Sequence, residues 1–101
     1  MWHGIFQDAS SWIFNLNPDV SAPALMAAKA GLDVWLGNAR GTLYSSYPKD
    51  DKYKNIFSFA EIGTFDVPAV IKFVKQQTQA EKLQYVGYSQ GTTQMFYGMA
   101  S

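Results

Sequence analysis

The chain has 101 residues, the length of one small domain, of which 48% are apolar and 16% aromatic. This composition can fill a packed core and excludes an intrinsically disordered chain. The eight basic side chains balance the eight acidic ones without forming a long run, which argues against a nucleic-acid partner. Cysteine is absent, which excludes disulfides and thiolate metal sites.

Neither a targeting segment nor a membrane segment can be recognised in the sequence. Residues 1–8 lack the basic and apolar regions of a signal peptide, and nowhere do 18 apolar residues follow one another. We therefore predict no integral membrane segment and treat residues 1–101 as one folding unit or a piece of one. The longest loop-like stretch runs from Gly41 to Asn55.

The first predicted helix runs from Ala22 to Ala30 and is rich in the strong helix formers Ala, Leu and Met. Ser21 is a possible N-cap, and Gly31 is a natural left-handed terminator. A first strand is predicted at residues 33–36, which read Asp-Val-Trp-Leu and are followed by a glycine.

A second helical region is predicted to begin near Ser58, because Ser58 and Glu61 have the spacing of a capping box. Pro68 cannot lie deep inside a helix, so we predict a new helix, or a kinked continuation, with Asp66 as its N-cap. This helix would run to about Thr78. Its apolar face is formed by Val67, Val70, Ile71 and Val74.

A second strand is predicted at residues 83–86, and a last helix at residues 90–100. Alternating helices and strands produce a parallel sheet with helices on its faces, so the predicted fold class is α/β. Parallel sheets are buried on both faces. A unit with two or three strands therefore leaves apolar surface uncovered unless more sheet follows.

The segment Gly87-Tyr88-Ser89-Gln90-Gly91 matches the pattern G-x-S-x-G, directly after a predicted strand and at the start of a predicted helix. In this context the serine lies on a sharp, strained turn that exposes its hydroxyl. We predict Ser89 as a catalytic nucleophile and the backbone N–H of Gln90 as one donor of an oxyanion hole. The alternative is a glycine-rich turn without chemistry.

A second oxyanion donor in such sites comes from a loop early in the chain, and residues 3–6 contain a suitable His-Gly pair. The backbone N–H of Ile5 is the candidate. His3 is the only histidine, but in this arrangement the base follows the serine in the chain. We therefore interpret His3 as a residue that shapes its loop, and we expect no metal and no cofactor.

All acidic residues, from Asp8 to Glu81, also precede Ser89, so none stands where the acid of a catalytic triad belongs. We expect the acid and the histidine to lie beyond Ser101. A serine without a partner base is a weak nucleophile, so the 101-residue chain alone is expected to be nearly inactive.

Together these segments resemble the acid lipase family, which includes gastric lipase and lysosomal acid lipase. The resemblance spans essentially the whole chain, in the family's order and spacing. It is carried by HGIF at 3–6, AGLDVWLGNARG at 30–41, FSFAE at 57–61, DVPA at 66–69 and YVGYSQGTT at 85–93. The run at 33–41 is the most distinctive, because other α/β-hydrolases seldom have it.

The resemblance implies a partial α/β-hydrolase fold and hydrolysis of triacylglycerols or sterol esters through an acyl-enzyme on Ser89, with the amides of Ile5 and Gln90 as oxyanion hole. It also suggests a secreted or lysosomal protein. We interpret Asn38 and Arg40 as residues that brace their loop, since a buried arginine is usually paired. One departure is Tyr88, where the family commonly has histidine.

Three interpretations stay open from the sequence. The chain can be a piece of an active lipase, or a short product without catalysis that serves as a pseudoenzyme or interaction module. It can also be an α/β-hydrolase with another chemistry, such as a thioesterase or acyltransferase, because the fold does not fix the function. The run at 33–41 argues against this last interpretation.

Overall fold

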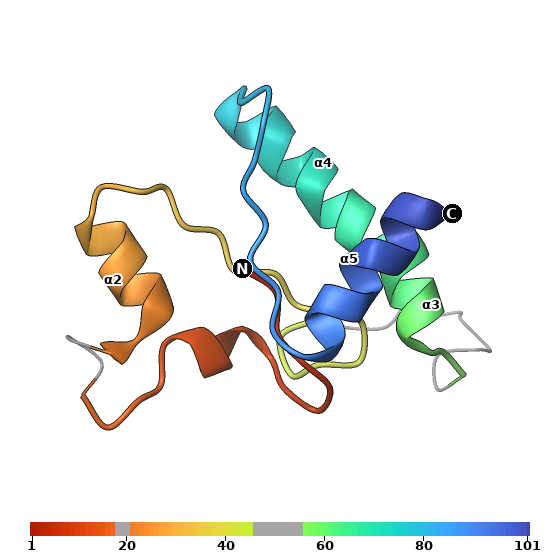
Figure 1. Ribbon diagram of the computed structural model, residues 1–101, viewed down its shortest axis with the longest axis horizontal. Coiled ribbons are helices and arrows are strands. Elements are labelled where there is room, and N and C mark those ends of the chain that lie inside the picture. The colour runs from red at the N-terminus through yellow and green to blue at the C-terminus, as the bar shows by residue number, and fades with distance from the viewer. Residues whose placement is uncertain (18–20, 46–55) are drawn as a thin grey trace.

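The computed structural model describes residues 1–17, 21–45 and 56–101 of the chain. The elements are the 3-10 turn η1 (Ala9–Trp12), α2 (Pro23–Lys29), α3 (Phe59–Glu61), the π-helical turn η2 (Ile62–Asp66), α4 (Val67–Thr78) and α5 (Gln90–Ala100). Figure 1 shows α2 on one side of the N-terminal segment and α3, α4 and α5 on the other. Most of the predicted loop at 41–55 lies outside the described residues.

The N-terminal segment lies between the two segments that were predicted as strands. Trp2 forms parallel bridges with both Gly37 and Gly87. The Trp2 N–H donates to the Val86 carbonyl at 2.8 Å, and the Tyr88 N–H donates to the Trp2 carbonyl at 3.1 Å. Among the described residues the pairing does not extend beyond these single bridges, because the N-terminal segment turns away from both of its neighbours at residues 4–7. The parallel sheet as a whole therefore stays a prediction.

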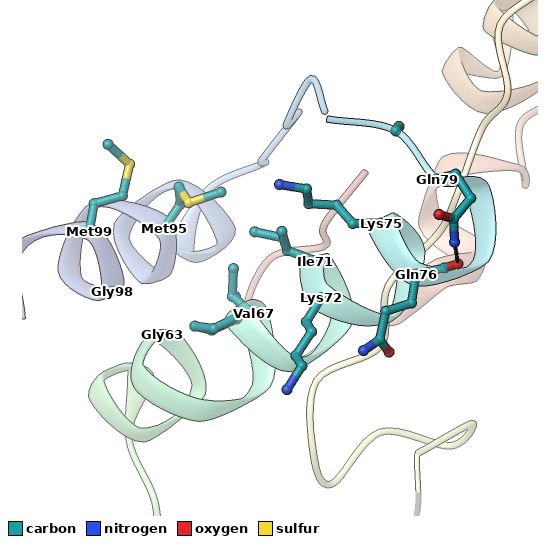
Figure 2. Close-up of a pocket in the computed structure, with 12 residues that line it drawn as sticks. Gly63, Val67, Ile71, Lys72, Lys75, Gln76, Gln79, Met95, Gly98 and Met99 are labelled. Atoms are coloured by element: carbon teal, nitrogen blue, oxygen red, sulfur yellow. Dashed lines mark hydrogen bonds between the residues drawn. The ribbon is translucent and has the colours of Figure 1, made fainter. Parts of the chain in front are cut away.

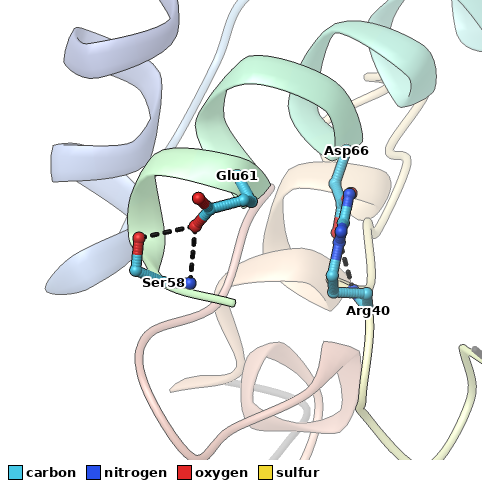
Figure 3. A network of polar contacts seen from close by, with 4 residues as sticks. All are labelled: Arg40, Ser58, Glu61 and Asp66. Carbon is cyan, nitrogen blue, oxygen red and sulfur yellow. Dashed lines mark hydrogen bonds and ion pairs between the residues drawn. The ribbon is translucent and has the colours of Figure 1, made fainter. Parts of the chain in front are cut away.

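The predicted capping box at the start of α3 is confirmed. The Glu61 carboxylate accepts hydrogen bonds from the Ser58 N–H at 2.7 Å and from the Ser58 hydroxyl at 2.6 Å (Figure 3). The Ser58 Oγ in turn accepts from the Ala60 N–H at 3.1 Å. These bonds from Ser58 lower the pKa of Glu61 below its ordinary value.

The helical region after Ser58 is one continuous run rather than two helices, so the kinked continuation is the correct alternative. Asp66 does not act as an N-cap: its backbone is helical, with φ −72° and ψ −49°, and its side chain makes no capping bond. The helical run does not break here, because it continues through the π turn η2, in which the Val67 N–H donates to the Ile62 carbonyl. Pro68 then falls within the first turn of α4, where its missing N–H costs little.

The helix α2 begins one residue later than predicted, at Pro23. Its N-cap is Ala22, which has no capping side chain. The prediction of Ser21 as N-cap is wrong, because the Ser21 hydroxyl donates to the Asn17 carbonyl at 2.6 Å instead. Gly31 has a φ of 92° and ends the helix as predicted.

The core is a cluster in which Trp2, Ala39, Ile62 and Val67 are buried. The predicted apolar face of α4 is confirmed, since Val67 and Val74 are buried and Val70 and Ile71 pack against the core cluster. Among the described helices none is long and apolar enough to cross a membrane.

The helix α5 crosses the π turn η2 at very short range. A Cβ atom on Gly63 would lie 2.4 Å from the Gln94 carbonyl oxygen, and one on Gly98 would lie 2.3 Å from the Gly63 carbonyl oxygen. Only glycine fits at both positions. This crossing fixes the direction of α5, and therefore the direction of the turn that precedes it.

Candidate active site

Ser89 lies at the sharp turn between the bridge at Gly87 and the start of α5. Its backbone has φ 52° and ψ −123°, a conformation with positive φ that non-glycine residues rarely adopt. The residue is exposed, and its hydroxyl makes no capping bond to the helix. The turn therefore holds the hydroxyl outward.

The two glycines of the G-x-S-x-G pattern are required by close contacts. A Cβ on Gly87 would lie 2.8 Å from the Tyr85 ring and 3.0 Å from the Thr92 nitrogen. A Cβ on Gly91 would lie 2.6 Å from the His3 carbonyl oxygen. The Tyr85 hydroxyl also donates to the Gly91 carbonyl at 2.9 Å. The first turn of α5 is thus pressed against the N-terminal segment.

The loop at residues 4–7 lies against Ser89. A Cβ on Gly4 would lie 3.1 Å from the Ser89 Cβ and 3.3 Å from the Tyr88 carbonyl oxygen. Gln7 closes the loop twice: its N–H donates to the Gly4 carbonyl at 3.3 Å, and its Oε1 accepts from the Gly4 N–H at 2.9 Å. Phe6 takes the positive φ of 58° that the turn demands.

The two predicted donor amides are open. Gln90 is the first residue of α5, so its N–H has no partner within the helix. In the described part of the chain, neither this N–H nor that of Ile5 donates a hydrogen bond. Both residues neighbour the contact between Gly4 and Ser89. The arrangement therefore offers two free donors beside an exposed hydroxyl.

His3 is buried, and both of its ring nitrogens are hydrogen-bonded. Nε2 accepts from the Ala39 N–H at 3.0 Å, and Nδ1 lies 2.9 Å from the Gly4 carbonyl oxygen. A backbone N–H can only donate and a carbonyl can only accept, so the proton is on Nδ1 and the ring is neutral. The ring also stacks on Trp2. This geometry fits the loop-shaping interpretation and leaves His3 no free nitrogen for Ser89.

The predicted bracing residues hold the 33–41 segment to its surroundings. The Asn38 Oδ1 accepts from the Ala9 N–H at 2.8 Å. The Arg40 guanidinium binds Asp66 through Nε at 2.9 Å and Nη2 at 2.6 Å, and the Arg40 N–H donates to the same carboxylate (Figure 3). The guanidinium also lies about 6 Å from the ring centroids of Phe57 and Phe65.

The described acidic side chains that make hydrogen bonds are engaged away from Ser89. Asp8 accepts from the N–H and hydroxyl of Ser10, and these bonds lower the pKa of Asp8. Asp33 accepts from the Trp35 indole at 3.1 Å. None of the hydrogen bonds among the described residues joins an acid to Ser89 or to His3, so no triad is assembled within them.

A separate hollow of about 610 Å³ lies between α4 and α5. Figure 2 shows Val67 and Ile71 of α4 and Met95 and Met99 of α5 around it, with Lys75 at its edge. Its lining contains none of the candidate residues at positions 5, 89 and 90. This hollow is therefore distinct from the predicted site at Ser89.

A family model described as the alpha/beta hydrolase fold matches residues 1–100, and the chain belongs to this family. Its relatives are lipases. The chain is 46% identical to lipase member M of Mus musculus over 98% of its length, and 48% identical to gastric triacylglycerol lipase of Rattus norvegicus over 90%. It is 44% identical to a putative lysosomal acid lipase/cholesteryl ester hydrolase of Crotalus adamanteus.

These matches confirm the resemblance to the acid lipases that the sequence motifs indicated. The chain spans about a quarter of the length of the curated relatives it matches, with 24% of lipase member M and 24% of rat gastric lipase covered. The α/β class is supported by the family model, and the helices of the structure agree with the helical half of that fold.

The sequence interpretation missed three residues around the site. Gln7 closes the loop that carries Ile5, while Trp2 and Gln94 form a buried hydrogen bond at 2.6 Å. Gln7 gave a weak signal, because a glutamine three residues after a glycine can close a turn. Gln94 gave none, because a polar residue in mid-helix is ordinarily exposed.

Proposed function

We propose that this chain contains the nucleophile and the oxyanion hole of a serine hydrolase of the acid lipase type. The substrates are carboxylic esters of triacylglycerols or sterols, as the names of the relatives suggest. The observation that carries the proposal is the turn at Ser89, which combines an exposed hydroxyl, a strained backbone and the open amide of Gln90, and against which the loop with the open amide of Ile5 lies. The catalytic acid and histidine would come from polypeptide outside residues 1–101.

In the proposed reaction, the Ser89 oxygen attacks the ester carbonyl carbon while its proton passes to the histidine. The carbonyl oxygen becomes an oxyanion, which the N–H groups of Ile5 and Gln90 stabilise. The C–O bond to the alcohol then breaks, and the alcohol leaves with the proton from the histidine. A water molecule repeats the sequence on the acyl-enzyme, which releases the fatty acid and restores Ser89.

In the test protein, residues 1–101 of this chain replace the matching segment of rat gastric triacylglycerol lipase. The remaining chain of the rat enzyme supplies the rest of the fold. We call this protein the graft. The proposal expects the graft to hydrolyse tributyrin and to be labelled once by a fluorophosphonate probe, as read by intact mass. Ser89→Ala in the graft should abolish both. A Ser89→Ala graft that keeps the activity would rule out the proposed nucleophile.

A second measurement uses the native protein. An antibody against this segment captures the protein from its source, and its intact mass is compared with the 11.3 kDa of the 101 residues. A mass several times larger fits a lipase that supplies its own acid and histidine. A mass near 11.3 kDa would contradict the proposal and favour a short product without catalysis.

A further inference from the structure

The side chain of Gln94 is the most deeply buried polar group next to the proposed site. The residue is 2% exposed, and it lies one helical turn after Gln90 in α5. Its Oε1 accepts from the Trp2 indole N–H at 2.6 Å. Since an indole nitrogen only donates, this bond fixes the orientation of the amide.

The other end of the Gln94 amide therefore faces Gln90. The Gln94 Nε2 donates to the Gln90 Oε1 at 3.0 Å, so the Gln90 side chain is held back along α5. This bond also keeps the Gln90 Oε1 from binding the free N–H groups at the start of the helix. The backbone N–H of Gln90 stays available in consequence.

The same amide reaches the segment that carries the other donor. Trp2 stacks on His3 with 5.8 Å between ring centroids, and His3 binds the Gly4 carbonyl, which is part of the peptide unit that supplies the Ile5 N–H. Gln94 thus joins the N-terminal segment, which carries Ile5, to the start of α5, which carries Gln90. None of the other described side chains makes hydrogen bonds to both of these segments.

Burying a side-chain amide in the interior is unfavourable unless its polar atoms are hydrogen-bonded. An apolar side chain of the same size would pack without the need for two hydrogen bonds, whereas a buried polar group that loses its partner destabilises the fold. Buried polar networks instead restrict the structure to one arrangement. The hydrogen bond between Trp2 and Gln94 is therefore better explained by the positioning of the residues it joins than by packing alone.

We infer that Gln94 is a positioning residue, which sets the distance between the Ile5 and Gln90 amides through its bonds to Trp2 and Gln90. This inference rests on the proposed function. A donor aimed at the oxyanion contributes only when charge develops on the oxygen. Loss of Gln94 should therefore lower kcat and leave KM nearly unchanged.

The experiment compares four proteins in the graft: Gln94→Leu, Trp2→Phe, the double variant with both changes, and Thr93→Val as a matched exposed control on α5. Each single variant leaves a buried polar group without its partner, so both Tm and kcat should fall. The double variant removes both polar partners, so it has no unpaired buried polar group, although the smaller phenylalanine ring still leaves a cavity in the core. Its Tm should therefore lie above the value expected if the losses of the two single variants simply added.

The kcat of the double variant separates the two roles. For a positioning residue it should stay about 10- to 100-fold below that of the parent graft, with KM unchanged, because a displacement near 1 Å costs about that much. A kcat of the double variant equal to that of the parent graft would overturn the inference and make the pair merely structural. The proposed function is tested separately by Ser89→Ala, so its failure is not confused with that of Gln94.

Discussion

The carbonyl oxygen of Gly63 lies against the Cα of Gly98, so close that a Cβ on Gly98 would be 2.3 Å away. Gly98→Ala must therefore push α5 away from η2. Overpacking of this kind costs about 1–3 kcal/mol, which lowers the Tm of the graft by several degrees. Differential scanning calorimetry measures the shift. The exposed Thr93→Val control should leave Tm unchanged, and an unchanged Tm for Gly98→Ala would contradict the close crossing.

The ion pair of Arg40 and Asp66 should depend on the geometry of the guanidinium and not only on its charge. Arg40→Lys keeps the charge but cannot reproduce the paired bonds from Nε and Nη2. With side chains only 26% and 13% exposed, we expect a loss of about 1–3 kcal/mol in urea denaturation of the graft. Asp66→Asn keeps one acceptor oxygen and should lose less than Asp66→Ala. Equal losses for these two variants would show that the oxygen kept in Asp66→Asn does not hold Arg40.

The capping box predicts a defined pH dependence for the start of α3. Bonds from Ser58 lower the folded-state pKa of Glu61 below its ordinary value of 4.5. The carboxylate therefore stabilises the fold fully above pH 4.5, and this contribution is lost as the pH falls through the lower folded-state pKa. Glu61→Gln removes the titration.

The measurement for Glu61 is the difference in unfolding free energy between the parent graft and Glu61→Gln, followed from about pH 7 to about pH 3. The difference should shrink as the pH falls below 4.5 and stay constant above it. A difference that grows toward acid pH would contradict the lowered pKa.

The addition of a single methyl group at Gly4 should lower the catalytic rate. In Gly4→Ala the new Cβ would meet the Ser89 Cβ at 3.1 Å and the Gln7 Oε1 at 3.0 Å, so the loop that carries Ile5 must move by a few tenths of an ångström. We expect kcat for a soluble ester to fall about 10-fold or more in the graft. Ser11→Ala, exposed in η1, is the control. An unchanged kcat would separate this loop from the reaction.

The isolated 101-residue chain should behave as a loosely packed state. Large apolar side chains such as Phe6, which is 99% exposed, and Leu16, which is 100% exposed, find no cover among the described residues. We expect binding of the dye ANS, a weak near-ultraviolet dichroism signal and aggregation at high concentration. A sharp cooperative thermal transition of a soluble monomer would refute this expectation.

Local signals in the sequence predicted local structure well. The box at Ser58, the terminator Gly31 and the helix at 90–100 all depend on neighbours within a turn or two, and the structure confirms them. The turn around Ser89 was also predicted in position, because its two glycines and the strand-to-helix context are written in five residues.

Apart from the Ser21 N-cap, which a bond to nearby Asn17 overturns, the errors and omissions arose where a distant partner decides the outcome. Asp66 looks like an N-cap by itself, but Arg40, 26 residues away, binds its carboxylate. The bond between Trp2 and Gln94 spans 92 residues and leaves no periodic pattern. The N-terminal segment was not predicted as the central pairing partner, because three residues are too few to show a strand pattern.

The central place of Trp2 has a consequence for how the chain folds. Both bridging partners, Gly37 and Gly87, follow it in the sequence, and the second comes near the end of the segment. During synthesis Trp2 is made first, and its second bridge cannot form until Gly87 has been translated. Contacts between residues this far apart slow folding. The turn that exposes Ser89 therefore depends on a pairing between residues near the two ends of this segment.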